Sequence, residues 1–255
     1  MRRVDDVRTV AGARLSTVVV GGGPRVTARL AEPVASPRGG CPVVAFGHGF
    51  VQRPFLYDSL LAAVAACGYV VVAPDTETGP WPRHERLADD LWRVALWARE
   101  VWAWPGEGSG IALAGHSMGA GVAILAASRH PDADAVVALA ALQTRPPAQL
   151  EAVAAPSLFV VGSQDRIVPP SRTRPLYEAV TGPAHWAVVR GGYHCGFLDR
   201  ARWRDLACDG GDLPRSQQLA ITGQLVGTWL DARFRGGTFT APPGVDLEVR
   251  SRSPE

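Results

Sequence analysis

Lysine is absent from the chain, and all 26 of its basic residues are arginines. Covalent chemistry through a lysine amine, such as Schiff-base formation, is therefore excluded. The 24 acidic residues leave a formal net charge of +2, and arginines and acids are interspersed along the chain. A pI near 8.5 is weak evidence for a nucleic-acid partner because no basic stripe or arm accompanies it. We expect no nucleic-acid partner.

Long apolar runs are also missing, and a helix that crosses a bilayer needs about 18 or more apolar residues. The longest candidates, residues 120–127 and 136–142, have the lengths of a buried helix and a buried strand. Asp5 and Asp6 lie where a signal peptide would carry its apolar stretch. The sequence therefore predicts no membrane span and a cytoplasmic location. A mature secreted protein restarted at Met1 would have the same N-terminus, so an extracellular location is the alternative.

Cysteine is scarce, and no C-x-x-C pair occurs among the four cysteines, Cys41, Cys67, Cys195 and Cys208. Zinc and iron–sulfur sites therefore have little support, and we expect no metal site. Cys195 and Cys208 flank one loop, so a disulfide between them is one reading. The other reading is that all four are small buried hydrophobic side chains.

The chain has the composition of a soluble globular protein, with 255 residues of which 47% are apolar and 20% are charged. This length is at the upper end for one domain with one core. We expect a single domain over residues 1–235. Residues 236–255 are rich in glycine, proline and charge, which predicts a loosely attached tail.

Two β-rich runs, residues 15–20 and 26–30, are separated by a glycine- and proline-rich turn and predict an N-terminal antiparallel hairpin. Beyond it, short continuous apolar runs alternate with helical patterns, which predicts an α/β fold: a mainly parallel twisted sheet with helices on both faces. The strands are expected at residues 42–46, 69–73, 111–114, 136–142, 157–161 and 185–189. The helices are expected at residues 57–66, 83–102, 118–129, 172–180 and 216–234, with a short helical stretch around 147–153.

The carboxyl ends of parallel strands form the ligand-binding edge of such a sheet, so reactive residues should follow strands directly. Gly115-His116-Ser117-Met118-Gly119 matches the G-x-S-x-G pattern. An apolar strand leads into the motif and a helix of small residues leads out of it, as the strand–turn–helix context of this motif requires. Glycines two residues before and after the serine avoid collisions at the sharp turn. Ser117 is therefore the predicted nucleophile.

A serine hydroxyl needs an imidazole to take its proton, and six histidines compete for this role. His194 follows the last predicted parallel strand and the flexible pair Gly191-Gly192, at the ligand-binding edge. His185 begins that strand and would lie at the opposite end of the sheet. His130 closes a helix, where capping roles are common. His194 is therefore the predicted base.

The carboxylate that orients this imidazole is predicted to be Asp165, in the turn after the strand at residues 157–161. The chain order of nucleophile, acid and base is then the one expected for this type of fold. Asp199 and Asp205 follow the histidine and fit this order less well. Asp75 follows a strand but precedes the nucleophile, and a capping or turn role suits it better.

Two backbone N–H groups usually stabilise the negative charge that develops on a carbonyl oxygen during acyl transfer. Met118, directly after the nucleophile, should supply one of them. The loop after the first parallel strand, residues 47–51, should supply the other; Phe50 is the candidate and Val51 the neighbouring alternative. His48 is expected to brace this loop rather than to react.

With these pieces placed, residues 42–234 resemble the α/β-hydrolase family. The nearest branch looks like the compact esterases of the dienelactone hydrolase, chlorophyllase and cutinase-type polyester hydrolase group. The resemblance rests on Phe46-Gly47-His48-Gly49-Phe50, on residues 115–121, on GSQDRIVP at 162–169 and on GGYHCGF at 191–197. It implies that the side chains of Phe50, Met118 and Ile167 line the substrate cleft. Dienelactone hydrolases would carry cysteine at position 117, and the serine found here favours ordinary esters.

Many members of this family insert a helical lid after the strand that we expect to end at Leu142, but residues 143–156 leave no room for one. An uncovered cleft suits bulky or polymeric esters. The sequence thus predicts a serine carboxylic-ester hydrolase without a lid domain, a cofactor or a metal, and we expect a monomer. An amidase or peptidase with the same triad is the first alternative. A non-catalytic binding scaffold is the second, although such a scaffold would normally have lost a triad residue.

Overall fold

The computed structural model describes residues 7–21, 23–35, 40–102, 110–200 and 208–250, together with the backbone of residues 2–3. Its strands are β1 (Arg2–Arg3), β2 (Arg8–Val10), β3 (Ala13–Val20), β4 (Val26–Pro33), β5 (Val43–Gly47), β6 (Val70–Pro74), β7 (Ile111–His116), β8 (Ala135–Leu139), β9 (Ser157–Gly162), β10 (Ala184–Val189) and β11 (Val245–Arg250). The α-helices are α1 (Asp58–Ala66), α2 (His84–Trp102), α3 (Met118–Arg129), α4 (Pro170–Ala179) and α5 (Arg215–Phe234). Short 3₁₀ turns are η1 (Pro54–Tyr57), η2 (Leu150–Ala152) and η3 (His194–Phe197).

The described strands form one sheet in the order β1-β3-β4-β6-β5-β7-β8-β9-β10-β11, with β2 beside β3. The strands from β6 to β10 are parallel, whereas β3, β4 and β11 join the sheet in antiparallel fashion. The sequence predicts this α/β architecture, with a mainly parallel sheet behind an N-terminal hairpin. In the hairpin, Val20 pairs with Val26 across the turn.

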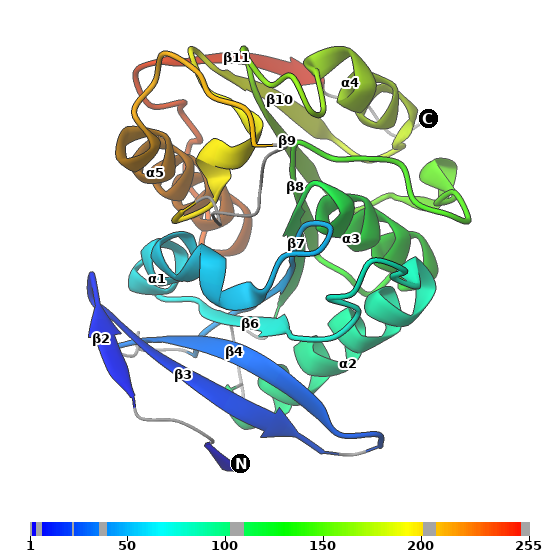
Figure 1. Cartoon of the computed structure of the whole chain (residues 1–255), viewed down its shortest axis with the longest axis vertical. Coiled ribbons are helices and arrows are strands. Elements are labelled where there is room, and N and C mark those ends of the chain that lie inside the picture. Colours follow the sequence, from blue (N-terminus) through cyan, green and yellow to red (C-terminus); the bar gives the residue numbers. More distant parts are fainter. Residues whose placement is uncertain are drawn as a thin grey trace.

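Helices cover both faces of the sheet (Figure 1). α1 and α5 lie on one face, and α2, α3 and α4 lie on the other. Every residue of β5, β6, β7, β8 and β9 is buried, because apolar side chains from successive positions enter two separate cores. The continuous apolar runs in the sequence are thus strands buried on both faces.

The strand expected at residues 136–142 ends earlier than predicted, at Leu139. The chain turns at Ala140, which has a positive φ of 47°, and Leu142 then donates a backbone hydrogen bond to the Ser117 carbonyl. Residues 140–142 therefore leave the sheet while their side chains remain largely buried, which is why an apolar run alone overestimates this strand. The segment from there to β9 contains only the short turn η2.

The tail that the sequence predicts to be loosely attached is instead part of the sheet over residues 245–250. β11 pairs with β10 at six consecutive positions, from Val245 opposite Val189 to Arg250 opposite Ala184. Val245 is buried, Leu247 and Arg250 are half-buried and the other three residues are exposed, as suits a strand at the border of a sheet.

Candidate active site

Ser117 occupies a strained turn between β7 and α3. Its φ of 57° and ψ of −120° lie outside the usual regions for a residue with a side chain. Such strain persists only where the surroundings hold it in place. Here the Ser117 N–H donates to the Leu139 carbonyl at 2.8 Å, and the Ser117 carbonyl accepts from the N–H groups of Ala120 and Gly121. The turn presents Ser117 at the carboxyl end of the sheet.

Glycines allow the backbone to pack closely around this turn. A Cβ on Gly115 would lie 2.3 Å from the Gly119 carbonyl oxygen, and one on Gly119 would lie 2.1 Å from the Gly47 carbonyl oxygen. No side chain fits at such distances. Gly119 therefore lets the start of α3 approach the loop after β5, which is the loop expected to carry the second oxyanion donor.

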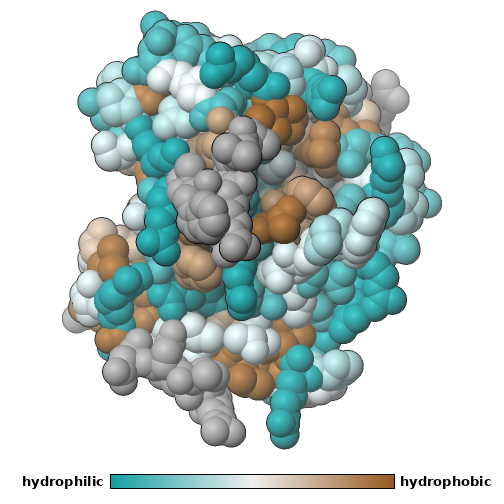
Figure 2. Space-filling model, viewed as in Figure 1, coloured by the Kyte–Doolittle hydropathy of each residue, from teal (hydrophilic) through white to brown (hydrophobic). Residues whose placement is uncertain are grey.

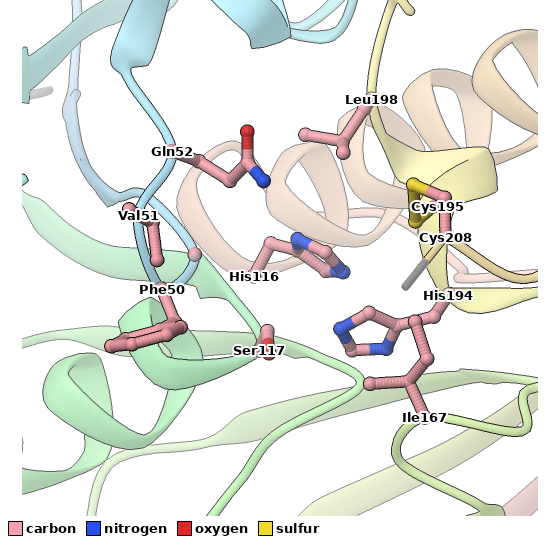
Figure 3. A pocket seen from close by; sticks show the side chains of 11 residues that line it. Phe50, Val51, Gln52, His116, Ser117, Ile167, His194, Cys195, Leu198 and Cys208 are labelled. Carbon is pink, nitrogen blue, oxygen red and sulfur yellow. A yellow bond between two sulfur atoms is a disulfide. The ribbon is translucent and has the colours of Figure 1, made fainter. Parts of the chain in front are cut away.

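His194 and Asp165 form a buried hydrogen-bonded pair, with 2.8 Å between Nδ1 of the imidazole and Oδ2 of the carboxylate. Asp165 follows β9 and His194 follows β10, which are neighbouring parallel strands. The other oxygen of Asp165 accepts from the N–H groups of Ile167 and Val168 at 3.0 and 2.7 Å. Because Nδ1 carries the proton shared with the carboxylate, Nε2 is left to accept a proton. Figure 3 shows the His194 ring directed toward Ser117.

Ser117 and His194 line a cleft of about 270 Å³ (Figure 3). Phe50 and Ile167 also line it, as the family resemblance implies. Met118 does not: its side chain is 3% exposed and packs into the core on the side of α2 and α3. The geometry therefore gives Met118 no side-chain contact with a substrate, and only its backbone N–H is at the site.

The two expected oxyanion donors are the N–H of Met118, directly after Ser117, and the N–H of Phe50, a residue that lines the cleft. The Met118 N–H is in the first turn of α3, where N–H groups have no intrahelical partner. Among the described residues, none accepts a hydrogen bond from the Phe50 N–H, whereas the neighbouring Gly49 N–H donates to the Tyr57 hydroxyl. The Phe50 side chain is 50% exposed at the cleft. Both amides are thus available for an oxygen atom of a bound ligand.

His48 holds the loop after β5 in place, as the sequence suggests. The ring is fully buried, and its two nitrogens lie 2.9 Å from the Gly49 carbonyl oxygen and 2.8 Å from that of Thr76. Asp75, expected in a turn or cap, forms an ion pair with Arg53. The His48–Thr76 hydrogen bond and the Arg53–Asp75 ion pair thus connect the loop after β5 to the loop after β6.

His116, inside the motif, is an uncharged structural residue. Its Nδ1 lies 2.9 Å from the Tyr57 hydroxyl, and its buried Nε2 has no hydrogen-bond partner among the described residues. Burial, together with the nearby His194 imidazole, lowers the pKa of His116 well below its ordinary range. The ring stacks at an angle beside His194, with 4.5 Å between ring centres. The ring therefore packs directly against the proposed base.

The other histidine and carboxylate candidates are engaged elsewhere or not described. His130 stacks on Trp92. Asp199 accepts a hydrogen bond from the Ser59 N–H at the start of α1, and burial raises the pKa of its carboxyl group. Asp205 lies outside the described residues.

Sequence reasoning did not single out two residues that hold the backbone around His194. The fully buried Gln218 of α5 accepts from the Tyr193 N–H at 3.0 Å and donates to the Tyr193 carbonyl at 2.8 Å. Asp209 accepts from the N–H groups of His194 and Cys195. Both contacts join residues that are distant in sequence, and neither Gln218 nor Asp209 belongs to a recognisable motif.

Cys195 and Cys208 form a disulfide, so the first of the two readings of the cysteines holds for this pair. Cys41 and Cys67 are free thiols, and burial raises the pKa of each. In the part of the chain that the structure describes, no three His, Cys, Asp or Glu side chains are grouped as metal ligands would be. No helix within the described ranges is long and apolar enough to cross a bilayer.

A mainly parallel sheet with a serine at a strand-to-helix turn and a hydrogen-bonded aspartate and histidine after two later strands is consistent with the α/β-hydrolase class. Comparison with protein families is more specific: the family described as PET hydrolase-like matches residues 13–198, and the chain belongs to this family. The chain is also similar to Chlorophyllase-1 of Arabidopsis thaliana, with 34% identity over 95 residues. That match covers 35% of this chain and 29% of the chlorophyllase, so it spans less than a third of the relative's length. At the level of the family, the comparisons support a carboxylic-ester hydrolase.

Proposed function

We propose that this chain is a serine carboxylic-ester hydrolase that acts through Ser117, His194 and Asp165. The observation that carries the proposal is the 2.8 Å hydrogen bond between His194 Nδ1 and Asp165, with the ring directed toward Ser117 in the same cleft. Membership of the PET hydrolase-like family supports the reaction class. The chlorophyllase match supports it over a shorter stretch.

In the proposed first half-reaction, Ser117 Oγ attacks the ester carbonyl carbon while His194 Nε2 takes the hydroxyl proton. Asp165 stabilises the imidazolium that forms. The N–H groups of Phe50 and Met118 stabilise the oxyanion. The C–O bond to the alcohol then breaks, and His194 delivers the proton to the leaving alkoxide. An acyl group remains on Ser117.

In the second half-reaction, a water molecule gives a proton to His194 and attacks the acyl carbon. The tetrahedral intermediate collapses, Ser117 recovers its proton, and the carboxylic acid is released. In this scheme His194 carries every proton transfer, and two backbone N–H groups act as the oxyanion donors.

We further propose that the substrates are bulky or polymeric esters. The support is the open cleft: the chain between β8 and β9 forms only η2, and Phe50 and Val51 are exposed at its border. Figure 2 shows apolar side chains exposed among hydrophilic ones near the middle of the face that is turned to the viewer. An apolar rim favours the acyl or aromatic part of such an ester.

The test combines a p-nitrophenyl ester assay with labelling by a fluorophosphonate, read by mass spectrometry. We expect Ser117→Ala to lose both hydrolysis and labelling while folding normally. Ser128→Ala, which removes a hydroxyl from α3 outside the cleft, should keep both. Retained hydrolysis in Ser117→Ala would exclude this mechanism.

Two further comparisons separate the alternatives. An anilide of the same acyl group should be hydrolysed far more slowly than the ester, and the reverse order would indicate an amidase or peptidase. Esters of increasing acyl size and a polyester film should be accepted; hydrolysis of short acyl esters alone would contradict the polymer proposal.

A further inference from the structure

The carboxylate of Asp209 lies between the loop that carries Asp165 and the loop that carries His194. Its Oδ2 accepts from the N–H of Arg166 at 3.0 Å and from the N–H of His194 at 3.1 Å. Its Oδ1 accepts from the N–H of Cys195 at 3.0 Å. One side chain thus binds the residue after the proposed acid and also the proposed base itself.

Asp209 belongs to a short segment, residues 208–213, that holds both loops at several further points. We call this segment the clasp. The side chain of Gln164, on the other side of Asp165, accepts from the Asp212 N–H at 2.8 Å. The Leu213 N–H donates to the Gly191 carbonyl at 3.0 Å. Contacts of the clasp therefore flank Asp165 and also reach the loop of His194.

The clasp is itself anchored at both ends. The disulfide joins Cys208, the residue before Asp209, to Cys195, the residue after His194. At the other end the clasp leads into α5, which begins at Arg215. The position of Asp209 relative to the base is therefore fixed through a covalent link as well as by hydrogen bonds.

We propose that Asp209 is a positioning residue for the reaction: it sets the distance between the acid and base loops and so keeps His194 aligned with Asp165 and Ser117. This inference rests on the proposed function. Without Asp209, the first N–H groups of η3 lose their acceptor, since a short turn cannot satisfy them itself. The loop of His194 would then keep the disulfide, the Gln218 contacts and the hydrogen bonds to Gly191 and Gly192, but the N–H groups of His194 and Cys195 would have lost their acceptor. A shift of about 1 Å in a positioned group can cost about 10²-fold in rate.

The first experiment measures kcat and KM for a p-nitrophenyl ester in Asp209→Ala and Asp209→Asn. We expect Asp209→Ala to lower kcat by about 10- to 100-fold while KM stays within about twofold, because Asp209 does not itself line the cleft. Asp209→Asn keeps one acceptor oxygen and should retain an intermediate kcat. If Asp209→Ala fails to fold, Asp209→Asn provides the test in its place.

Asp134→Ala is the matched control. Asp134 also accepts a backbone hydrogen bond, from the Ile111 N–H at 2.8 Å, but at the opposite end of the sheet. We expect this variant to lower the melting temperature without changing kcat at a temperature well below melting. The proposal is wrong if a folded Asp209 variant, alanine or asparagine, keeps kcat within about twofold of wild type. It is also wrong if kcat falls by the same amount in Asp134→Ala as in Asp209→Ala for a similar loss of melting temperature.

A second readout does not depend on activity. The imidazole proton between His194 and Asp165 should give a far-downfield ¹H NMR resonance, assigned by its loss in Asp165→Ala. We expect Asp209→Ala to shift or broaden it and Asp134→Ala to leave it unchanged. A resonance that is unchanged in Asp209→Ala, or absent from wild type, would overturn the positioning role. If wild type neither hydrolyses esters nor reacts with the fluorophosphonate, the proposed function fails, and this resonance alone decides the role of Asp209.

Discussion

The hydroxyl oxygen of Tyr57 lies 2.9 Å from Nδ1 of His116, a residue 59 positions further along the chain. The same oxygen accepts a hydrogen bond from the Gly49 N–H at 3.0 Å. The Tyr57 hydroxyl proton has an acceptor in Nδ1 when the neutral His116 imidazole carries its own proton on Nε2, and we assign this tautomer. One buried hydroxyl thus connects the loop of Phe50 to the residue before Ser117.

We expect Tyr57→Phe to lower both stability and activity. The Gly49 N–H and Nδ1 of His116, both buried, lose their hydrogen-bond partner, which costs about 1–3 kcal/mol of unfolding free energy. The loop of Phe50 also loses a support, so kcat should fall, although by less than the 10²-fold or more that removal of an oxyanion donor costs. Denaturant unfolding and ester hydrolysis measure the two effects.

Tyr69→Phe is the control for this change, since the Tyr69 hydroxyl donates to Asp231 next to the amino end of β6. It should lower stability and leave kcat unchanged. An equal loss of kcat in both variants would show that the Tyr57 hydroxyl has no particular effect on the site.

The lowered pKa of His116 predicts acid sensitivity of the fold. Well above pH 6.5 the side chain is neutral in both the folded and the unfolded chain, so it adds no pH dependence there. Below that pH the unfolded chain takes up a proton that the folded protein excludes. Unfolding free energy should then fall with pH, by up to about 1.4 kcal/mol per pH unit for this one residue.

His116→Gln tests this point, because glutamine keeps an acceptor for the Tyr57 hydroxyl and does not titrate. Denaturant unfolding at pH 8 gives the cost of the substitution itself. Between pH 6.5 and 5 we expect the variant to lose less stability than wild type. Parallel pH curves for the two proteins would argue against a buried, uncharged His116.

Gly119→Ala should abolish activity and strongly destabilise the fold. Its Cβ would lie 2.1 Å from the Gly47 carbonyl oxygen, so the start of α3 and the loop after β5 would have to separate. Gly79→Ala is the matched control, because no atom lies within 4 Å of the position of its Cβ. Thermal melting and fluorophosphonate labelling should show a large effect for the first and little effect for the second. A stable, reactive Gly119→Ala protein would contradict the close packing described here.

Removal of the disulfide by the double change Cys195→Ser and Cys208→Ser should lower unfolding free energy by about 2–4 kcal/mol. Wild type treated with reductant should melt at a similarly lowered temperature. Cys67→Ser, which changes a free thiol, should respond to reductant as wild type does. A melting temperature that reductant leaves unchanged would show that the bond contributes little to stability.

The central strands and the candidate site were accessible from sequence because each depends on local patterns. A strand buried on both faces is a continuous apolar run, and Ser117, Asp165 and His194 each follow such a run. The strained turn at Ser117 is likewise recognisable from the glycines around it. The roles of these three residues remain predictions, whereas the structure shows that Ser117 and His194 line one cleft and that Asp165 is hydrogen-bonded to His194 behind it.

The contacts that hold the loops around the site could not be predicted from sequence. They form between residues that belong to no motif and that only the tertiary fold brings together. Tyr57 and Asp209 act through backbone groups and a histidine that lie far away in the chain. The side chain of Met118 illustrates a different limit. Its place after the nucleophile fixes its amide, but the direction of its side chain depends on how α3 packs.

The pairing of β11 with β10 has a practical consequence for shortened forms of the protein. The outer strand carries Asp246, Glu248 and Arg250, and charges on a bordering strand discourage self-association. A fragment ending at residue 235, where composition alone suggests trimming, would leave six positions of β10 unpaired on the side away from β9. Such a fragment would offer a bare, mostly apolar border to other molecules and should precipitate on expression, even with its reactive centre intact.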